Sequence, residues 1–203
     1  MSDSYQSIKD QVQGELKDRG SKFLSFAFPV SGEAEVKAIL SSLREKYWDA
    51  SHHCYAYMLG ASHSVFRAND DGEPSHSAGD PILSQIRSFK VSDILVVVVR
   101  YFGGTKLGVS GLIAAYRSAA FLALEQATII EKLITVKLMI TFSMAQTSIV
   151  MKTIRNSNAE IKDQQFDHEK LKNVIILEIR ESHEQGFKEH LQNFHTIEIT
   201  RSV

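Results

Sequence analysis

The stretch from Val91 to Ala127 constrains the fold of this chain most strongly. Ile94–Val99 is an uninterrupted apolar run, rich in β-branched residues, which predicts a strand covered on both faces. The turn that follows spans Gly103–Gly111 and holds four glycines, which allow positive φ and close backbone approach. From Val109 to Ala127, apolar residues recur at the three-and-four spacing of one buried helix face. We therefore expect a buried strand, a glycine turn and a helix at the centre of the fold.

The composition is that of an ordinary globular protein. Its 203 residues, 43% hydrophobic and 23% charged, suffice for one large domain or two small ones. Cys54 is the only cysteine, which excludes an internal disulfide framework and a cysteine-based zinc cluster. The N-terminus lacks the apolar stretch of a secretory signal, and no run approaches the ~18 apolar residues of a membrane span. We therefore expect a cytoplasmic protein with no membrane partner.

Charge is balanced in both halves of the chain. The formal net charge is −1 at pH 7. Residues up to Glu131 carry 13 basic and 15 acidic side chains, and the residues after it carry 10 and 9. Neither half is the strongly basic body of a duplex-binding protein, so contact with nucleic acid would require a local basic patch.

Residues 1–131 predict a mixed domain of strands and helices. Alternating apolar residues indicate strands, and Ser31 and Pro81 suit the starts of helices. The expected elements are a polar lead-in at Met1–Lys17, a strand at Ser21–Val30, a helix from Ser31 to about Tyr47, a strand at Ser51–Leu59 with a short partner at Ser64–Arg67, a loop at Asn69–Pro81 and a helix at Ile82–Phe89.

Residues 132–203 follow a different pattern. Strands are expected at Thr135–Phe142, Ala159–Phe166, Val174–Arg180 and Thr196–Arg201, with helices at Ala145–Asn156 and Glu184–Phe194. This βαββαβ order predicts a ferredoxin-like fold. The predicted fold class is therefore α+β, with an N-terminal domain at 1–131 and a C-terminal domain at 132–203.

Two catalytic interpretations of the glycine turn fail on spacing. Ser110 stands between a strand and a helix, but a nucleophile elbow needs glycine two residues after the serine, where this chain has Leu112. A phosphate-binding Walker loop fails as well, because Lys106 follows Thr105 instead of glycine. We therefore predict no catalytic residue in this turn.

Anion binding is the general interpretation that remains. Backbone N–H groups in a glycine turn at a helix start favour a negative charge, and Arg100 and Lys106 stand beside this turn in the sequence. The alternative is that the glycines only permit close packing. The residues expected to bind an anion or nucleic acid are Arg100, Gly103, Gly104, Lys106, Gly108 and Gly111.

The polar loop at Asn69–Pro81 and the strand before it supply further candidates. Three acids in an exposed loop are usually solvated, and their spacing is not that of a calcium loop, so we expect no metal and no cofactor. Histidine titrates near neutrality and suits acid–base chemistry. On an alternating strand His52 and His53 face opposite sides, so at most one points at a common site. The polar residues expected to line the site are His53, Asp71, Glu73, His76 and Tyr101.

Three blocks occur in a fixed order between residues 20 and 130. They are His53–Tyr57, then Asp71–Ser75 with Ala78–Gly79 and Pro81–Leu83, and then Arg100–Gly104 with Lys106–Gly108 and Gly111–Leu112. In this order and spacing they resemble the YigZ/Impact family. Two positions depart from the family pattern, since His76-Ser77 replaces its usual Gly-Thr and Val109-Ser110 stands where a small residue and glycine are usual.

The resemblance implies a fold and a field of activity. The N-terminal domain is expected to have a ribosomal protein S-five domain-two-like fold, and the C-terminal domain to be similar to the ferredoxin-like last domain of elongation factor G. Eukaryotic members regulate translation under amino-acid stress by competing for a protein activator of a stress kinase. For bacterial members, nucleic-acid binding is suggested by fold, which is an analogy.

Three hypotheses of function follow from the residues and the resemblance. The first is a translation-associated, non-enzymatic protein that binds RNA or a ribosome-associated partner through the face of the glycine turn. The second is a hydrolase or transferase acting on a phosphorylated or peptide-like small molecule, with His53 or Glu73 as base. The third is a protein–protein adaptor whose signature residues only hold the fold. The oligomeric state is not indicated.

Overall fold

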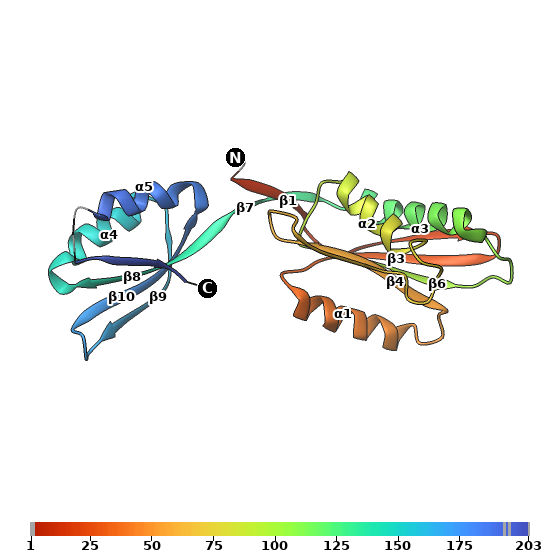
Figure 1. The fold of residues 1–203 in the computed structure, drawn as a ribbon, viewed down its shortest axis with the longest axis horizontal. Coiled ribbons are helices and arrows are strands. Elements are labelled where there is room, and N and C mark those ends of the chain that lie inside the picture. The colour runs from red at the N-terminus through yellow and green to blue at the C-terminus, as the bar shows by residue number, and fades with distance from the viewer. Residues whose placement is uncertain (1–2, 193, 195, 203) are drawn as a thin grey trace. The chain divides into compact units, whose positions relative to one another are not determined.

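The chain folds into two compact units (Figure 1). The computed structural model describes residues 3–192, 194 and 196–202. The N-terminal unit spans Tyr5–Lys132, and the C-terminal unit runs from Leu133 onward and includes Asp3 and Ser4. In the described part of the chain, no helix is long and apolar enough to cross a membrane.

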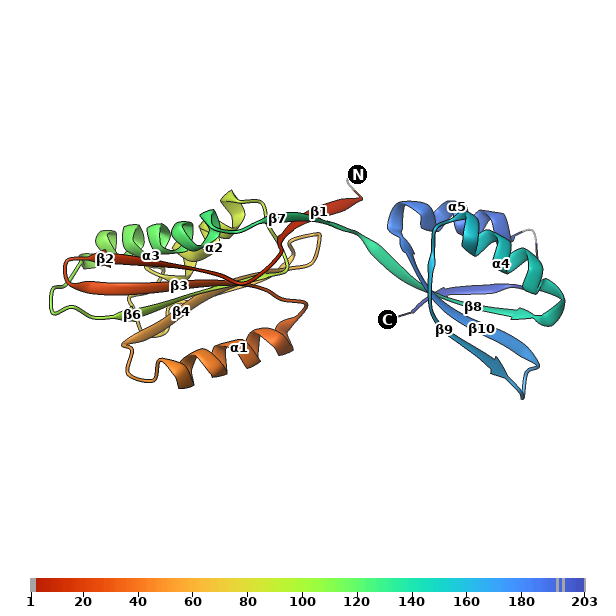
Figure 2. The same cartoon turned by 180° about the vertical axis from the view of Figure 1, so that it is seen from behind.

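The N-terminal unit is built on a five-stranded antiparallel sheet with the predicted central strand in its middle. The strands, in spatial order, are β2 (Val12–Asp18), β3 (Ser21–Pro29), β6 (Ile94–Tyr101), β4 (His52–Leu59) and β5 (Val65–Asn69). Helix α1 (Glu33–Lys46) covers one face, and α2 (Gly79–Ser88) and α3 (Gly108–Glu125) cover the other (Figures 1 and 2). Since β6 pairs on both edges and is covered on both faces, Ile94–Val99 is fully buried, as its apolar run predicts.

Alternation along β6 divides the apolar side chains between two cores. Val96 and Val98 pack on the α2–α3 side, whereas Leu95, Val97 and Val99 pack on the α1 side. Continuing this alternation to the end of β6 sends Arg100 to the α3 side. The strand therefore delivers a charged side chain to the place where the glycine turn begins.

The expectation of a polar lead-in at the N-terminus is wrong. Residues 4–8 form β1 (Ser4–Ile8), which pairs with β7 (Ile129–Leu133), and β2 forms an edge strand of the main sheet. A hairpin turn at Arg19 and Gly20 joins β2 to β3, with φ of 45° and 82°. Two positive φ values match the right-handed twist of the flanking strands.

The C-terminal unit has the predicted ferredoxin-like fold. Its strands β8 (Thr135–Ser143), β9 (Glu160–Asp167), β10 (Lys172–Arg180) and β11 (Glu198–Arg201) form an antiparallel sheet in the order β11-β8-β10-β9. A 3-10 turn at Met144–Gln146 leads into α4 (Thr147–Asn156), and α4 and α5 (Glu181–Gln192) pack on one face of the sheet. Residue 193 of the predicted second helix lies outside the described residues.

An ion-pair cluster joins α5 to the last strand and makes this unit sensitive to acid. Glu184 accepts hydrogen bonds from Arg201 Nε at 2.9 Å and from Lys188 Nζ at 2.7 Å. The Arg201 guanidinium holds the pKa of Glu184 at about 2, below its ordinary 4.5. Because the folded pKa is depressed, the stabilisation is fully present above pH 4.5 and is lost as the pH falls towards 2.

We expect Glu184→Gln to reduce this acid sensitivity. The unfolding free energy that the unit loses between pH 4.5 and about pH 2 should be smaller in the variant by about 1 kcal/mol. Amide hydrogen exchange of β8 and β10, followed against pH, measures it. The control is Glu169→Gln, because the Glu169 side chain forms no ion pair with any described residue. Equal acid profiles for the two variants would contradict the assignment.

Candidate functional site

Each of the strands β4 and β6 has polar side chains on both faces of the sheet. His52 is the register partner of Arg100 in the antiparallel pair. By strand alternation, His52, Cys54 and Arg100 face the α2–α3 side, whereas His53 and Tyr101 face the α1 side. The polar residues at the end of the sheet are thus split between two environments.

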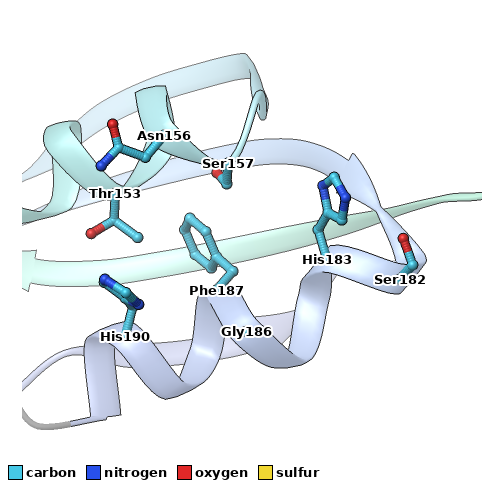
Figure 3. A pocket seen from close by; sticks show the side chains of 8 residues that line it. All are labelled: Thr153, Asn156, Ser157, Ser182, His183, Gly186, Phe187 and His190. Atoms are coloured by element: carbon cyan, nitrogen blue, oxygen red, sulfur yellow. The ribbon is translucent and has the colours of Figure 1, made fainter.

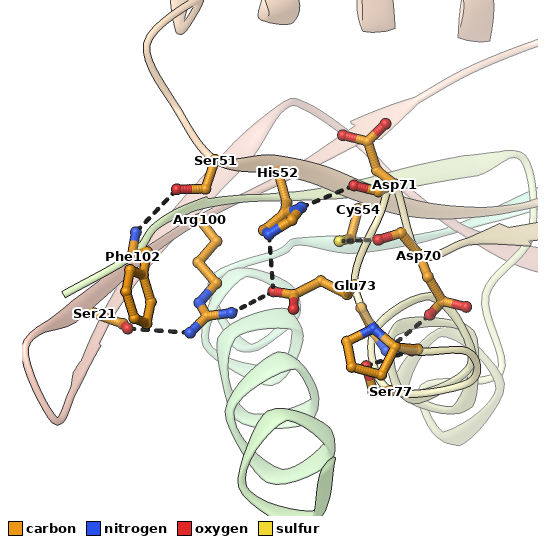
Figure 4. A network of polar contacts seen from close by, with 12 residues as sticks. Ser21, Ser51, His52, Cys54, Asp70, Asp71, Glu73, Ser77, Arg100 and Phe102 are labelled. Atoms are coloured by element: carbon orange, nitrogen blue, oxygen red, sulfur yellow. Dashed lines mark hydrogen bonds and ion pairs between the residues drawn. The ribbon is translucent and has the colours of Figure 1, made fainter. Parts of the chain in front are cut away.

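Arg100 forms a buried ion pair with Glu73, which comes from the loop before α2 (Figure 4). The Nη1 atom donates to Glu73 Oε1 at 2.5 Å, and the two side chains are 5% and 4% exposed. The Nη2 atom donates to Ser21 Oγ at 3.3 Å. The guanidinium also lies 5.4 Å and 5.5 Å from the ring centroids of Phe23 and Phe102. Its positive charge is therefore neutralised inside the protein.

Glu73 is also the centre of a chain of buried hydrogen bonds. The Tyr116 hydroxyl donates to Glu73 Oε1 at 2.7 Å. Cys54 Sγ lies 3.3 Å from that hydroxyl and 3.0 Å from the carbonyl oxygen of Asp70. Burial raises the pKa of the Cys54 thiol and that of the Tyr116 hydroxyl, so both are protonated at neutral pH. Neither group is an activated nucleophile.

The Asp70 carboxylate closes the loop that carries Glu73. It accepts backbone N–H groups from His76 at 2.9 Å, Ala78 at 2.9 Å and Gly79 at 2.8 Å. Burial acts to raise the pKa of Asp70, but these donors outweigh it and hold the pKa below its ordinary value. Asp70 is thus a structural residue that fixes the loop over the sheet.

Asp71 and His53 do not line the site, which corrects the expectation for both. Asp71 accepts hydrogen bonds from Arg44 Nη2 and from the backbone N–H of His53, both at 2.6 Å, on the α1 side. Burial lowers the pKa of His53. The imidazole on the site side is His52, whose Nε2 lies 3.8 Å from Glu73 Oε1. The one-residue alternation of β4 decides between the two histidines.

Gly103 serves close packing. A Cβ atom there would lie 1.8 Å from the carbonyl carbon of Gly20, so the turn and the β2–β3 hairpin touch backbone to backbone. The N–H of Gly103 donates to Ser21 Oγ at 3.2 Å, and that of Phe102 donates to Ser51 Oγ at 3.2 Å. These two donors are used within the protein and are not offered to an anion.

The other glycines of the turn are explained by backbone conformation and by packing. Gly104 and Gly108 have φ of 84° and 72°, in the left-handed region that favours glycine, and α3 begins at Gly108. Gly111 lies in the first turn of α3, where a Cβ would approach Leu107 Cβ to 3.1 Å. The turn is therefore shaped by backbone geometry.

The acidic loop and the glycine turn meet at one cavity of about 340 Å³. Lys106 lies at this cavity, is exposed and forms no ion pair with a described residue. Phe102 is 49% exposed. The cavity combines apolar walls, a buried carboxylate and one unpaired lysine. Its lining residues are Glu73, Pro74, Arg100, Phe102, Lys106, Leu107, Gly108, Val109 and Leu112.

His76 and Tyr101 lie outside this cavity, contrary to expectation. The His76 imidazole is exposed, with Nδ1 2.6 Å from Asp80 Oδ2. Its φ of 64° is in the left-handed region, at a position where the YigZ/Impact pattern usually has glycine. Tyr101 points to the α1 side and donates to Asp49 Oδ1 at 2.9 Å.

Comparison with known proteins agrees with the three sequence blocks. Residues 19–124 match the Impact N-terminal domain. This chain belongs to the IMPACT family. The IMPACT family member YvyE of Bacillus subtilis (strain 168) is 36% identical over 129 residues, which cover 64% of this chain and 59% of YvyE. The IMPACT family member YigZ of Escherichia coli (strain K12) is 40% identical over 110 residues, 53% of this chain and 54% of YigZ.

The chain thus spans 59% and 54% of the length of these two curated relatives. The fold recurs as a whole in a crystal structure described as that of a hypothetical protein. The match covers 100% of this chain and 99% of the chain in that structure, with 25% sequence identity and a TM-score of 0.77. The IMPACT match contains every residue of the Glu73–Arg100 network, from Ser21 to Tyr116.

Sequence reasoning missed three residues of this IMPACT site. Tyr116 was predicted only as part of the buried face of a helix, although a buried phenol hydroxyl needs a hydrogen-bond partner and so signals a polar neighbour. Phe102 was identified only within the Arg100–Gly104 block, with no role of its own. His52 was set aside in favour of His53, and only the register of β4 against β6 separates them.

A second hollow, of about 430 Å³, lies between α4 and α5 (Figure 3). Asn156, His183 and His190 line it and are exposed. Among the described residues around it there is no lysine, arginine or carboxylate, and it lies outside the IMPACT match. Within the described ranges, no three His, Cys, Asp or Glu side chains are grouped to hold a metal ion. The cavity beside the glycine turn is the stronger candidate.

Proposed function

We propose that this IMPACT family protein binds single-stranded RNA in the translation apparatus through the turn surface, defined as Arg19, Phe102, Lys106 and Val109. The observation that carries the proposal is an exposed aromatic ring and an unpaired lysine that line the same cavity. Phe102 is 49% exposed and Val109 is 53% exposed. Proteins that bind single strands combine aromatic rings, on which bases stack, with cations that follow the backbone.

Arg19 belongs to the turn surface because of the packing of two glycines. It precedes Gly20 in the β2–β3 hairpin, and Gly20 touches Gly103 backbone to backbone. Arg19 is exposed and forms no hydrogen bond or ion pair with other described residues. With Lys106 it supplies the local positive charge that a chain of net charge −1 needs to attract phosphates.

The geometry favours binding over catalysis. Arg100 is committed to Glu73, and Glu73 accepts hydrogen bonds from both Arg100 and Tyr116. Glu73 Oε1 is thus occupied by donors from the protein itself. His53, the other base considered, faces the α1 side. The hydrolase or transferase alternative therefore has less support than RNA binding.

The family resemblance supports the link to translation. Eukaryotic members regulate translation through a protein partner, and both domain folds recur in proteins that touch ribosomal RNA. This support is analogy and identifies no particular RNA. A ribosome-associated protein on the same face is the competing ligand, and absence of RNA binding in the test below would favour it.

The test is a salt titration of RNA binding, measured by fluorescence anisotropy with a labelled single-stranded oligoribonucleotide. We expect Lys106→Ala to weaken binding and to reduce the slope of log affinity against log salt by about 0.7, the value for one phosphate contact on a single strand. We expect Phe102→Ala to weaken binding by about 1–3 kcal/mol, the worth of one stacked base.

Matched controls separate these effects from general changes. Lys90→Ala removes an exposed lysine that lies before β6, at the opposite end of that strand from the turn surface. Phe66→Ala removes a ring that is also 49% exposed and also lies near an arginine, Arg87, but on β5. Equal losses of RNA affinity in the test variants and in the controls would contradict the proposal. It would also be contradicted if the unaltered protein did not bind RNA at low salt.

A further inference from the structure

One oxygen of Glu73 is left without a protein donor at the cavity beside the turn. Glu73 Oε1 accepts from Arg100 at 2.5 Å and from Tyr116 at 2.7 Å. In Figure 4 the lines from Arg100 and His52 both reach this same oxygen. Oε2 accepts no hydrogen bond from any described residue, although the side chain is only 4% exposed and lines the cavity. Oε2 is thus the part of this side chain that is reached from the cavity, so it can accept a hydrogen bond from a ligand.

The charges at the cavity restrict the kind of donor. Glu73 contributes one negative charge, and Arg100 and Lys106 contribute two positive charges, so the lining is positive by one charge. This balance disfavours an ammonium or guanidinium ligand, because Lys106 would repel it. It favours a neutral N–H donor carried by a molecule that is anionic elsewhere.

The walls restrict the shape of the ligand. Leu107, Val109 and Leu112 are apolar, and the Phe102 ring stands at the same cavity. The volume of about 340 Å³ is at the small end of ligand sites. A flat heterocycle stacked on Phe102, with a phosphate towards Lys106, satisfies both the apolar walls and the free lysine.

We infer that this cavity receives one nucleotide whose base carries an exocyclic amino group, with that group donating to Glu73 Oε2. The inference rests on the proposed function and deepens it, since it makes the turn surface selective for base identity. Cytosine, adenine and guanine carry such a group, whereas uracil flanks its ring N–H donor with two carbonyl oxygens, which a carboxylate repels. The shared chemistry fits a nucleotide within RNA or a free mononucleotide.

The experiment compares the full chain's affinity for oligocytidylate and oligouridylate of equal length, two pyrimidine strands that differ in this amino group. We expect about tenfold tighter binding of oligocytidylate, the effect of one hydrogen bond to a charged acceptor. Glu73→Gln keeps an acceptor for Arg100 and Tyr116 but adds an amide donor, so the preference should vanish or reverse.

A modified ligand tests the same hydrogen bond with the unaltered protein, so the result does not depend on whether Glu73→Gln folds. Oligocytidylate with two methyl groups on each exocyclic nitrogen lacks the donor, and we expect the unaltered protein to bind it about as weakly as oligouridylate, about tenfold below oligocytidylate. Cytidine monophosphate is the arm for a free nucleotide. If the monophosphate bound as tightly as oligocytidylate, the result would support the cavity as a nucleotide site and would overturn RNA as its ligand.

The outcomes separate the two proposals. Equal, salt-dependent binding of oligocytidylate and oligouridylate would overturn base selectivity and leave RNA binding standing. Absence of binding to the oligomers and to the monophosphate would overturn both. A preference for cytosine that persists in Glu73→Gln, or with the methylated strand, would overturn the role of Glu73.

Discussion

Replacing Arg100 by alanine should lower the unfolding free energy of the N-terminal unit by about 3–5 kcal/mol, the cost of leaving one partner of a buried ion pair alone. The reason is that the Glu73 side chain, 4% exposed, would stay buried without the guanidinium that lies 2.5 Å from it. Phe23 would also lose the cation beside its ring. Amide hydrogen exchange of β3, β4 and β6 in urea measures the loss.

The matched control is Arg44→Ala. Arg44 lies 2.6 Å from Asp71, but the two side chains are 51% and 26% exposed, so we expect a loss below about 1 kcal/mol. A double variant, Arg100→Met with Glu73→Leu, should recover much of the stability, because apolar groups of similar volume replace both charges. A loss in Arg100→Ala no larger than that in Arg44→Ala would show that the pair is not buried as described.

The second large effect is expected for Gly103→Ala. Its Cβ would lie 1.8 Å from the carbonyl carbon of Gly20 and 2.2 Å from the backbone nitrogen of Ser21. Backbone atoms cannot rotate away, so the glycine turn and the β2–β3 hairpin must separate, and we expect a loss of about 3 kcal/mol by the same hydrogen-exchange measurement. RNA affinity should fall as well, since this contact holds the hairpin that carries Arg19 against the turn that carries Lys106.

Gly32→Ala is the control for the glycine substitution. No atom lies within 4 Å of a Cβ at Gly32, and its φ of 178° is extended backbone that any residue adopts. We expect a change below about 1 kcal/mol, the usual range for glycine and alanine at the start of a helix. If both glycine variants were equally stable, the close approach of Gly20 and Gly103 would not be a feature of the folded protein.

The central strand and the C-terminal fold were predictable because their patterns are strong. Ile94–Val99 has no polar residue, and its short length and β-branched residues favour a strand covered on both faces. Residues 4–18 were not recognised as strands. In β2, Gln13, Glu15 and Lys17 are exposed while Val12, Gly14 and Leu16 are half-buried, which is ordinary for an edge strand but leaves few apolar residues to signal it.

The site was only partly predictable, because its chemistry depends on register and on long-range pairing. Sequence places Arg100 and Lys106 beside the glycine turn and Glu73 in the polar loop before it, but it does not show that the loop meets the turn or that Glu73 and Arg100 neutralise each other. The choice between His52 and His53 depends on which of them pairs with Arg100 across β4 and β6. The contact of Gly20 with Gly103 joins segments far apart in the chain and leaves no local signature.

The most direct test of the turn surface is a map of NMR shift changes when oligocytidylate is added to the full protein. We predict changes concentrated at Arg19, Phe102, Lys106 and Val109, extending to the side chain of Leu107 in the cavity. They should weaken as salt is raised. Changes concentrated instead at His183 and His190, in the hollow between α4 and α5, would contradict the assignment of RNA binding to the turn surface.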